Sequence, residues 1–250
     1  MIEYLKIIYR KLRARFKLII SVNWIKTYYF NYKKFPYKIA KKLPVFFFGK
    51  VKFSDISGEI IINSPIKRAM IGFGQSFEFP STSLGIAELS VKGKLVFNGY
   101  AQIGKDCVLS INKKGYCEFG YMATLGSKTK LICNERIILG DWTGIGYESQ
   151  LIDTNSHPMK NTKSGEYYPL NGPIVLGNYN SISNRVTIMQ NTITPNYCVV
   201  ASNTLCNKDY SILGNNILIG GIPAKLLKEN FTRDWAGEKE LLKKYKLMNW

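Results

Sequence analysis

The sequence predicts an all-β solenoid of short parallel strands, and the prediction depends on three observations about spacing. Buriable residues recur six positions apart without a slip at Leu176, Ile182, Ile188, Thr194, Val200 and Cys206. The same frame runs upstream through Leu139, Ile145 and Leu151, and small residues often follow the anchors, as Gly177 follows Leu176. A period of six fits neither a helical face nor simple strand alternation. It fits a hexapeptide parallel β-helix, in which each hexad supplies one strand and one corner.

Residues 1–44 are predicted to form a basic amphipathic helical segment. Apolar residues there lie at helical spacings, with basic residues largely between them: Ile7, Ile8, Leu12, Phe16, Ile19 and Ile20. Residues 1–50 contain thirteen Lys or Arg and one acidic residue, so +12 of the formal net charge of +18 lies in this stretch. Two interpretations stay open: residues 1–43 lie on an anionic membrane surface, or they cap the open end of the solenoid with solvated lysines. No nucleic-acid-binding motif is recognisable, and we expect no nucleic acid partner.

The solenoid is expected to extend over residues 45–225. The six-residue frame is faint at first, becomes clear from Val91, and changes phase between blocks, so the early corners are expected to hold extra residues. Residues 158–172 are polar and lack the frame, which predicts a loop that protrudes from one corner. Residues 226–250 are predicted to form a charged amphipathic helix on the outside of the prism.

Cysteine usage and hydropathy favour a cytoplasmic protein, peripheral at the inner face of the membrane if the first reading of residues 1–43 holds. Five cysteines form an odd set without a CxxC pair, which predicts no disulfide framework: Cys107, Cys117, Cys133, Cys198 and Cys206. No secretory signal is recognisable, and the apolar stretch 18–25 is too short to span a bilayer. Because no His/Cys cluster is present, we expect no metal site.

Three segments resemble the hexapeptide-repeat acyltransferases, which fold as a left-handed parallel β-helix. Asp153–Pro158 is similar to the catalytic segment of that family, Pro173–Gly177 to its re-entry into the coil, and Gly221–Lys225 to its closing motif. The resemblance is strongest over Gly140–Lys228, and the nearest relatives are bacterial sugar O-acetyltransferases of polysaccharide biosynthesis. It implies acetyl-CoA as the acyl donor, a saccharide acceptor of a capsule, O-antigen or exopolysaccharide, and a homotrimer.

His157 is the candidate catalytic base, and it is the only histidine in the chain. Acyl transfer from a thioester to a hydroxyl requires removal of the hydroxyl proton, and imidazole, with a pKa near ~6.5, is a neutral base at cytoplasmic pH. The residue stands where the ordered hexads give way to the loop, and the resemblance implies the same role. Asp153 and Asn155 would point to the same side in an extended strand, so either could orient the ring. The alternatives are a surface histidine at a corner and an ordinary polar corner residue at Asp153.

Aromatic residues near the catalytic segment are candidate walls of a sugar site, because sugar faces stack on aromatic rings. These residues are Trp142, Tyr147 and Tyr179. Structural packing of outward-facing aromatics is the alternative for each.

The resemblance also implies a groove for coenzyme A between the coils of adjacent subunits. Small residues after the anchors would keep the groove open, at Ser183, Ala201 and Ser202. Lys208 and Lys225 could meet the phosphates as point charges, with solvated lysines as the alternative.

Two other functions remain open beside O-acetylation. One is N-acylation of a nucleotide-linked amino sugar. The other is a non-catalytic β-helix scaffold that docks on membranes through residues 1–43, although a scaffold has no need of the His-Pro-loop arrangement.

Overall fold

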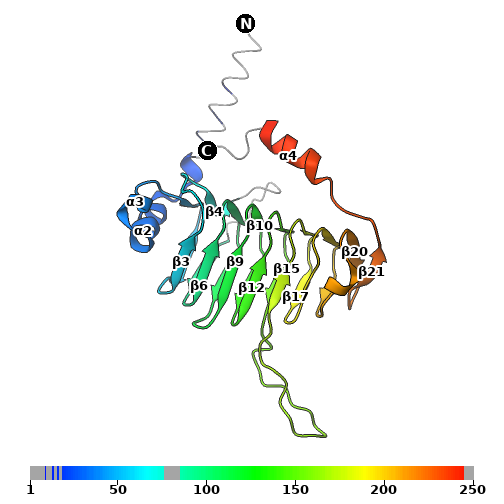
Figure 1. The fold of residues 1–250 in the computed structure, drawn as a ribbon. Coiled ribbons are helices and arrows are strands. Elements are labelled where there is room, and N and C mark those ends of the chain that lie inside the picture. Colours follow the sequence, from blue (N-terminus) through cyan, green and yellow to red (C-terminus); the bar gives the residue numbers. More distant parts are fainter. Residues whose placement is uncertain (1–8, 10–12, 14–15, 17–18, 76–84, 245–250) are drawn as a thin grey trace.

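The computed structural model describes residues 9, 13, 16, 19–75 and 85–244, and the chain in these ranges forms a left-handed parallel β-helix with three sides (Figure 1). We call the sides sheets I, II and III. Sheet I has nine strands: β1 (Val45–Phe47), β4 (Ile71–Gln75), β7 (Ala101–Gly104), β10 (Ala123–Leu125), β13 (Gly144–Ile145), β16 (Ser181–Ile182), β18 (Cys198–Val200), β20 (Ile217–Gly220) and β21 (Lys225–Lys228).

Sheets II and III complete each coil of the prism. Sheet II has seven strands: β2 (Val51–Asp55), β5 (Ala87–Val91), β8 (Val108–Ile111), β11 (Lys130–Cys133), β14 (Gln150–Ile152), β17 (Thr187–Met189) and β19 (Leu205–Cys206). Sheet III has five: β3 (Glu59–Ile62), β6 (Lys94–Phe97), β9 (Tyr116–Phe119), β12 (Arg136–Leu139) and β15 (Ile174–Leu176). All pairs are parallel except β20 with β21, which lies antiparallel at the C-terminal end.

The hexad anchors form the interior of this prism, which confirms the predicted fold class. Anchors of successive coils pair in register: Leu125 lies beside Ile145, Ile145 beside Ile182, and Ile182 beside Val200. All six anchors from Leu176 to Cys206 are buried. The one polar anchor, Thr194, accepts a hydrogen bond from the Gly177 amide (3.2 Å) and donates to Asn180 Oδ1 (2.5 Å), so its hydroxyl is satisfied inside the shaft.

The N-terminal end of the prism is capped by α2 (Trp24–Lys34) and α3 (Tyr37–Ala40). β1 is the edge strand of sheet I, and α2 covers its free edge with side chains. Asn31 donates to the Val45 carbonyl (2.7 Å) and accepts from the Val45 amide (3.2 Å), and the Thr27 hydroxyl accepts from the Phe47 amide (3.1 Å). The unpaired backbone groups of an edge strand can pair with a strand of another chain, and these hydrogen bonds occupy those groups in β1.

The C-terminal end begins with a short 3-10 turn, Ser211–Leu213, and the antiparallel strand β21. The helix expected from residue 226 begins later, as α4 (Trp235–Lys244), because residues 225–228 pair with β20 as a strand. No helix in the described ranges has the length and apolar character needed to cross a bilayer.

Candidate active site

The feature that stands out from the prism is an arm, which we define as residues 154–171, between β14 and β15 (Figure 1). Its two sides are held antiparallel by bridges between Thr154 and Asn171 and between Lys160 and Tyr167. At its root, the Asn155 amide donates to the Leu170 carbonyl (2.9 Å). The arm therefore leaves the corner between sheets II and III as an ordered hairpin, projecting from the lower edge in Figure 1.

His157 lies on the first side of this arm, close to the root, and is exposed. Its backbone amide donates to the Asn155 carbonyl (2.7 Å), and Ser156 before it takes a left-handed conformation with φ of 61°. Within the described ranges, no hydrogen bond reaches the imidazole from its own chain. The backbone that carries the ring is therefore held at the root of the arm, and both ring nitrogens are open to a ligand.

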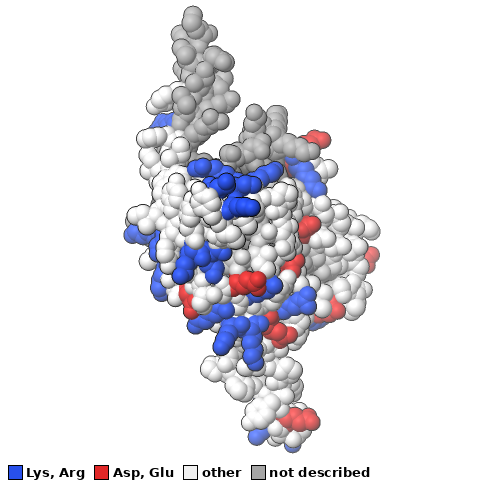
Figure 2. Space-filling view, turned by 60° about the vertical axis from the view of Figure 1, so that its left-hand side comes forward, with Lys and Arg blue, Asp and Glu red and all other residues white. Residues whose placement is uncertain are grey.

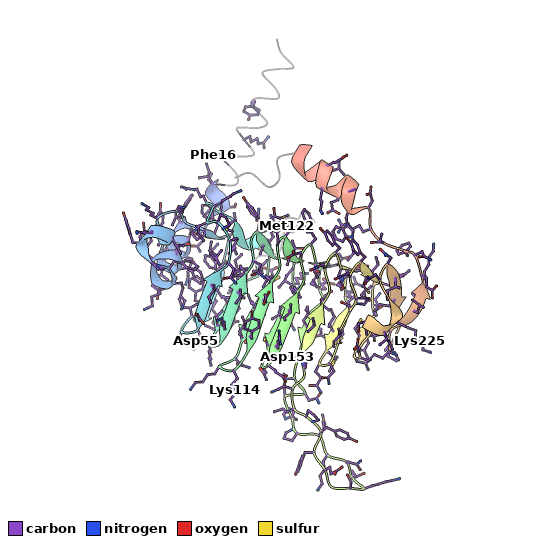
Figure 3. All side chains as sticks on the ribbon, viewed as in Figure 1. Phe16, Asp55, Lys114, Met122, Asp153 and Lys225 are labelled. Carbon is purple, nitrogen blue, oxygen red and sulfur yellow. The ribbon has the colours of Figure 1, made fainter. Side chains whose placement is uncertain are left out.

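Asp153 lies at the root of the arm (Figure 3) and is buried, whereas His157 is exposed. Its carboxylate is fully buried and accepts three backbone N–H groups of the preceding corner, from Asn134 (2.7 Å), Glu135 (2.8 Å) and Arg136 (2.9 Å). Its own carbonyl accepts from the Gly172 amide (3.0 Å), which closes the root. Asp153 therefore joins the arm to the neighbouring coil and does not hydrogen-bond His157.

Two amide side chains at this corner were not foreseen from the sequence. Asn171 ends the arm and Gln190 follows β17 in the next coil, and Asn171 Oδ1 and Gln190 Oε1 are buried atoms without a hydrogen-bond partner among the described residues. A buried acceptor without a partner costs free energy, so any donor that reached either oxygen would be stabilising. The sequence could have indicated Asn171 only by its position, directly before the chain re-enters the coil at Gly172.

The candidate phosphate-binding lysines lie apart from each other. Lys208 is exposed at the same corner as the arm, after β19, with its ammonium 5.6 Å from the centre of the Tyr210 ring. It stands two coils from His157, or about 10 Å along the axis for a strand spacing of ~4.8 Å. Lys225 begins β21 at the C-terminal end and is also exposed.

The corner between sheets I and II carries the candidate cofactor-binding residues Ser183, Ala201 and Ser202, together with Tyr147, a candidate wall of the sugar site. These residues follow strands β13, β16 and β18, so they lie on one edge of three successive coils. Backbone approach is close there, because a Cβ on Gly146 would meet the Ser183 carbonyl oxygen at 2.7 Å. The Ser202 hydroxyl hydrogen-bonds Asn184 Oδ1 (2.7 Å) and is otherwise exposed.

A row of exposed charged side chains lies along this corner between sheets I and II. Glu148 pairs with Lys128 (3.4 Å) and with Arg185 (3.1 Å). The hydrogen bond from Arg185 is the main cause that lowers the pKa of Glu148 below its ordinary value, and Lys128 adds to it. Both cations come from positions that repeat once per coil at this corner, and both are exposed.

Trp142 and Tyr179 lie at the third corner, between sheets III and I, and their rings face each other. The two ring planes differ by 6° with centroids 6.5 Å apart, and Tyr197 stacks on the far side of Tyr179 at 4.8 Å. Helix α4 covers this row: Trp235 packs edge-on against Tyr179, and the Lys239 ammonium lies over both rings at 4.9 and 4.5 Å. With their faces occupied, these rings are better suited to packing than to stacking a sugar, and they do not meet Tyr147 or His157.

Comparison with known proteins gives matches among solved structures alone: no protein-family model matches the chain, and no curated protein does. The N-acyltransferase AntD from Bacillus cereus is 14% identical with a TM-score of 0.48, over 84% of this chain and 98% of that chain. The polySia-specific acetyltransferase NeuO is 15% identical with a TM-score of 0.42, over 79% and 90%. A hexapeptide-repeat acetyltransferase from Vibrio cholerae O1 biovar eltor is 23% identical with a TM-score of 0.38, over 47% and 61%. The three similar structures are described as two acetyltransferases, one of them with hexapeptide repeats, and an N-acyltransferase.

Proposed function

We propose that the protein is an acetyl-CoA-dependent O-acetyltransferase that modifies a sugar hydroxyl in capsule, O-antigen or exopolysaccharide biosynthesis. The observation that carries the proposal is the presentation of His157. The only histidine of the chain stands exposed at the root of an ordered arm, its imidazole free of hydrogen bonds from the described residues. A general base needs this combination of a fixed backbone and an open ring nitrogen.

In the proposed reaction, the imidazole takes the proton of the acceptor hydroxyl as the oxygen attacks the thioester carbonyl. The tetrahedral intermediate then collapses, the carbon–sulfur bond breaks, and the imidazolium returns the proton to the departing thiolate of coenzyme A. The products are the sugar ester and the free thiol. Asp153 acts as a positioning residue, because its three backbone hydrogen bonds hold the root that carries His157. Asn155 contributes its carbonyl to the same turn.

We place the reacting groups between two protomers of a homotrimer. The arm projects clear of its own prism, so the ring of His157 needs a wall from another chain to enclose a substrate (Figure 1). Coenzyme A would lie along Ser183, Ala201 and Ser202 of one protomer, facing the corner of the next protomer that carries His157 and Lys208, and Lys225 is the second candidate to meet its phosphates. The protein would work in the cytoplasm, peripheral at the inner face of the membrane.

The test is release of free thiol from acetyl-CoA in the presence of a panel of saccharides. We expect His157→Ala to lower the rate by at least ~100-fold, since general base catalysis contributes 10²–10⁴-fold. Lys163→Ala, an exposed change on the same arm, is the matched control and should keep the wild-type rate. Thiol release at the wild-type rate in His157→Ala would remove the base assignment.

The chemical nature of the product distinguishes O-acetylation of a sugar hydroxyl from N-acylation of an amino sugar. Mild alkali removes an O-acetyl ester and leaves an amide, so mass spectrometry before and after alkali identifies N-acylation of an amino sugar. A scaffold without activity would show no turnover and no thermal stabilisation by coenzyme A.

A further inference from the structure

Helix α2 carries two apolar faces, and the prism uses one of them. The inner face, Thr27, Phe30 and Asn31, is buried against β1. A second row at i, i+3, i+4 and i+7 points to solvent: Ile25, Tyr28, Tyr29 and Tyr32 are all exposed, Ile25 to 83%. This spacing is that of an amphipathic helix that buries the row, yet each of the four side chains is at least 48% exposed. Tyr29 also stacks on Phe53 of β2, with ring centroids 6.3 Å apart.

The exposed row continues beyond the helix as one surface. Tyr28 stacks on Tyr32 with ring centroids 6.4 Å apart, and Tyr32 lies 6.4 Å from Tyr37 at the start of α3. Among the described residues that precede α2 in the sequence, Phe16, Ile19 and Ile20 are also exposed. We call the row Ile25, Tyr28, Tyr29, Tyr32 and Tyr37 the docking face.

The stretch of chain that forms the docking face carries charge of one sign. Residues 24–50 contain seven lysines and no acidic residue. Lys33, Lys38 and Lys41 are exposed beside the row, and the Lys41 ammonium lies 5.7 Å from the centre of the Tyr37 ring. Figure 2, which turns this end forward, shows Lys and Arg side chains in several groups, with Asp and Glu side chains among them in the lower half of the view.

We propose that the docking face lies on an anionic lipid surface, with the tyrosines and Ile25 at the level of the headgroups and the lysines against the lipid phosphates. Tyrosine side chains favour the membrane–water interface because the ring is apolar and the hydroxyl is polar. Basic residues beside such a row are attracted to anionic lipid. The inference gives a surface and a lipid class to the peripheral location proposed above and is independent of acyl transfer.

Two other occupants fit the face less well. A second copy of the chain would bring one strongly basic face against another, and like charges repel across an interface. Nucleic acid would satisfy the lysines but would leave an aliphatic residue such as Ile25 without a role.

Sedimentation with vesicles tests the proposal with the full chain. We expect binding to phosphatidylcholine vesicles that contain phosphatidylglycerol and little binding to phosphatidylcholine alone. Lys33→Glu, Lys38→Glu and Lys41→Glu together should weaken binding by roughly 100-fold. The matched triple reversal at Lys113, Lys114 and Lys130, exposed residues elsewhere on the prism, should have a far smaller effect. Lys114 lies at the lower edge, away from Phe16 (Figure 3).

A single apolar change tests the hydrophobic part. Ile25→Glu should weaken vesicle binding by about tenfold, whereas Ile212→Glu, at a residue that is 84% exposed near the other end of the prism, should not. Equal effects of the paired variants, equal binding to neutral and anionic vesicles, or a change in oligomeric state with Ile25→Glu would overturn the proposal. So would binding to a nucleic acid that competes with vesicles and ignores Ile25→Glu. Thiol release from acetyl-CoA, measured on the same variants, distinguishes failure of docking from failure of the proposed activity.

Discussion

At the scale of residues, the candidate site depends on a buried carboxylate that serves backbone groups. Asp153 accepts three N–H groups at a corner of the neighbouring coil, where the chain turns and leaves its amides without strand partners. Hydrogen bonds to a charged acceptor are stronger than neutral ones. The residue therefore fixes the position of the arm, and through it the position of His157.

We predict that Asp153→Asn lowers the free energy of unfolding by about 2–4 kcal/mol, because an amide presents one acceptor and places its NH2 group against backbone donors. Urea unfolding measures the change. Asp141→Asn is the control, since exposed Asp141 accepts one amide, that of Tyr121 (2.7 Å), and should cost less than about 1 kcal/mol. If Asp153 instead orients the imidazole directly, the pH dependence of thiol release would shift while stability stayed unchanged.

Spacing alone could not have shown which way Asp153 points. Period-two alternation places Asp153, Asn155 and His157 on one side only if all three belong to one strand. β14 ends at Ile152, and the chain bends there into the arm. Asp153 then continues the inward direction of Leu151, while His157 follows the arm outward. Where a strand ends is set by the tertiary contacts of the corner, which the hexad pattern does not record.

At the scale of elements, α4 is held to the prism by few contacts. Trp235 packs against Tyr179, and Lys239 lies over Trp142 and Tyr179 while donating to the Tyr179 hydroxyl (2.9 Å). Further along the helix, Leu241 is exposed. α4 is therefore a strap, by which we mean a helix attached to the prism mainly through the aromatic side chains of Trp142 and Tyr179.

We predict that Lys239→Met speeds amide hydrogen exchange in residues 235–241 by roughly tenfold, because a partly desolvated cation–π contact and its hydrogen bond are together worth about 1–2 kcal/mol. Exchange in the coils should not change, since the prism has its own core. Glu240→Gln, an exposed change on the same helix, is the control. Equal exchange in wild type and Lys239→Met would show that the strap is held by other groups.

At the scale of the whole molecule, the periodic part of the chain was predictable and the exceptions were not. Six-residue spacing identifies which residues enter the shaft, because each coil has three equivalent sides. It does not identify how the open ends are closed. The Asn31 and Thr27 bonds to β1 and the packing of Trp235 on Tyr179 join segments far apart in sequence, without a repeat to reveal them.

The shaft also makes a prediction about pH, because its thiols are enclosed by apolar side chains. Burial raises the pKa of Cys198 and Cys206 from an ordinary value of 9.0 to about 12. The unfolded chain loses these protons near pH 9, while the folded chain keeps them until near pH 12. Their contribution to stability is therefore complete below pH 9 and falls as the pH rises from 9 toward 12.

We expect each thiol to lower the free energy of unfolding by about 1.4 kcal/mol for each pH unit above its ordinary pKa. Urea unfolding of wild type and of the double variant Cys198→Ala, Cys206→Ala at a series of pH values measures the effect. The variant should be less stable at neutral pH, because two sulfur atoms leave the shaft, and should lose stability less steeply above pH 9. Parallel curves for the two proteins would mean that these thiolates are accommodated inside the prism, against the burial that the structure shows.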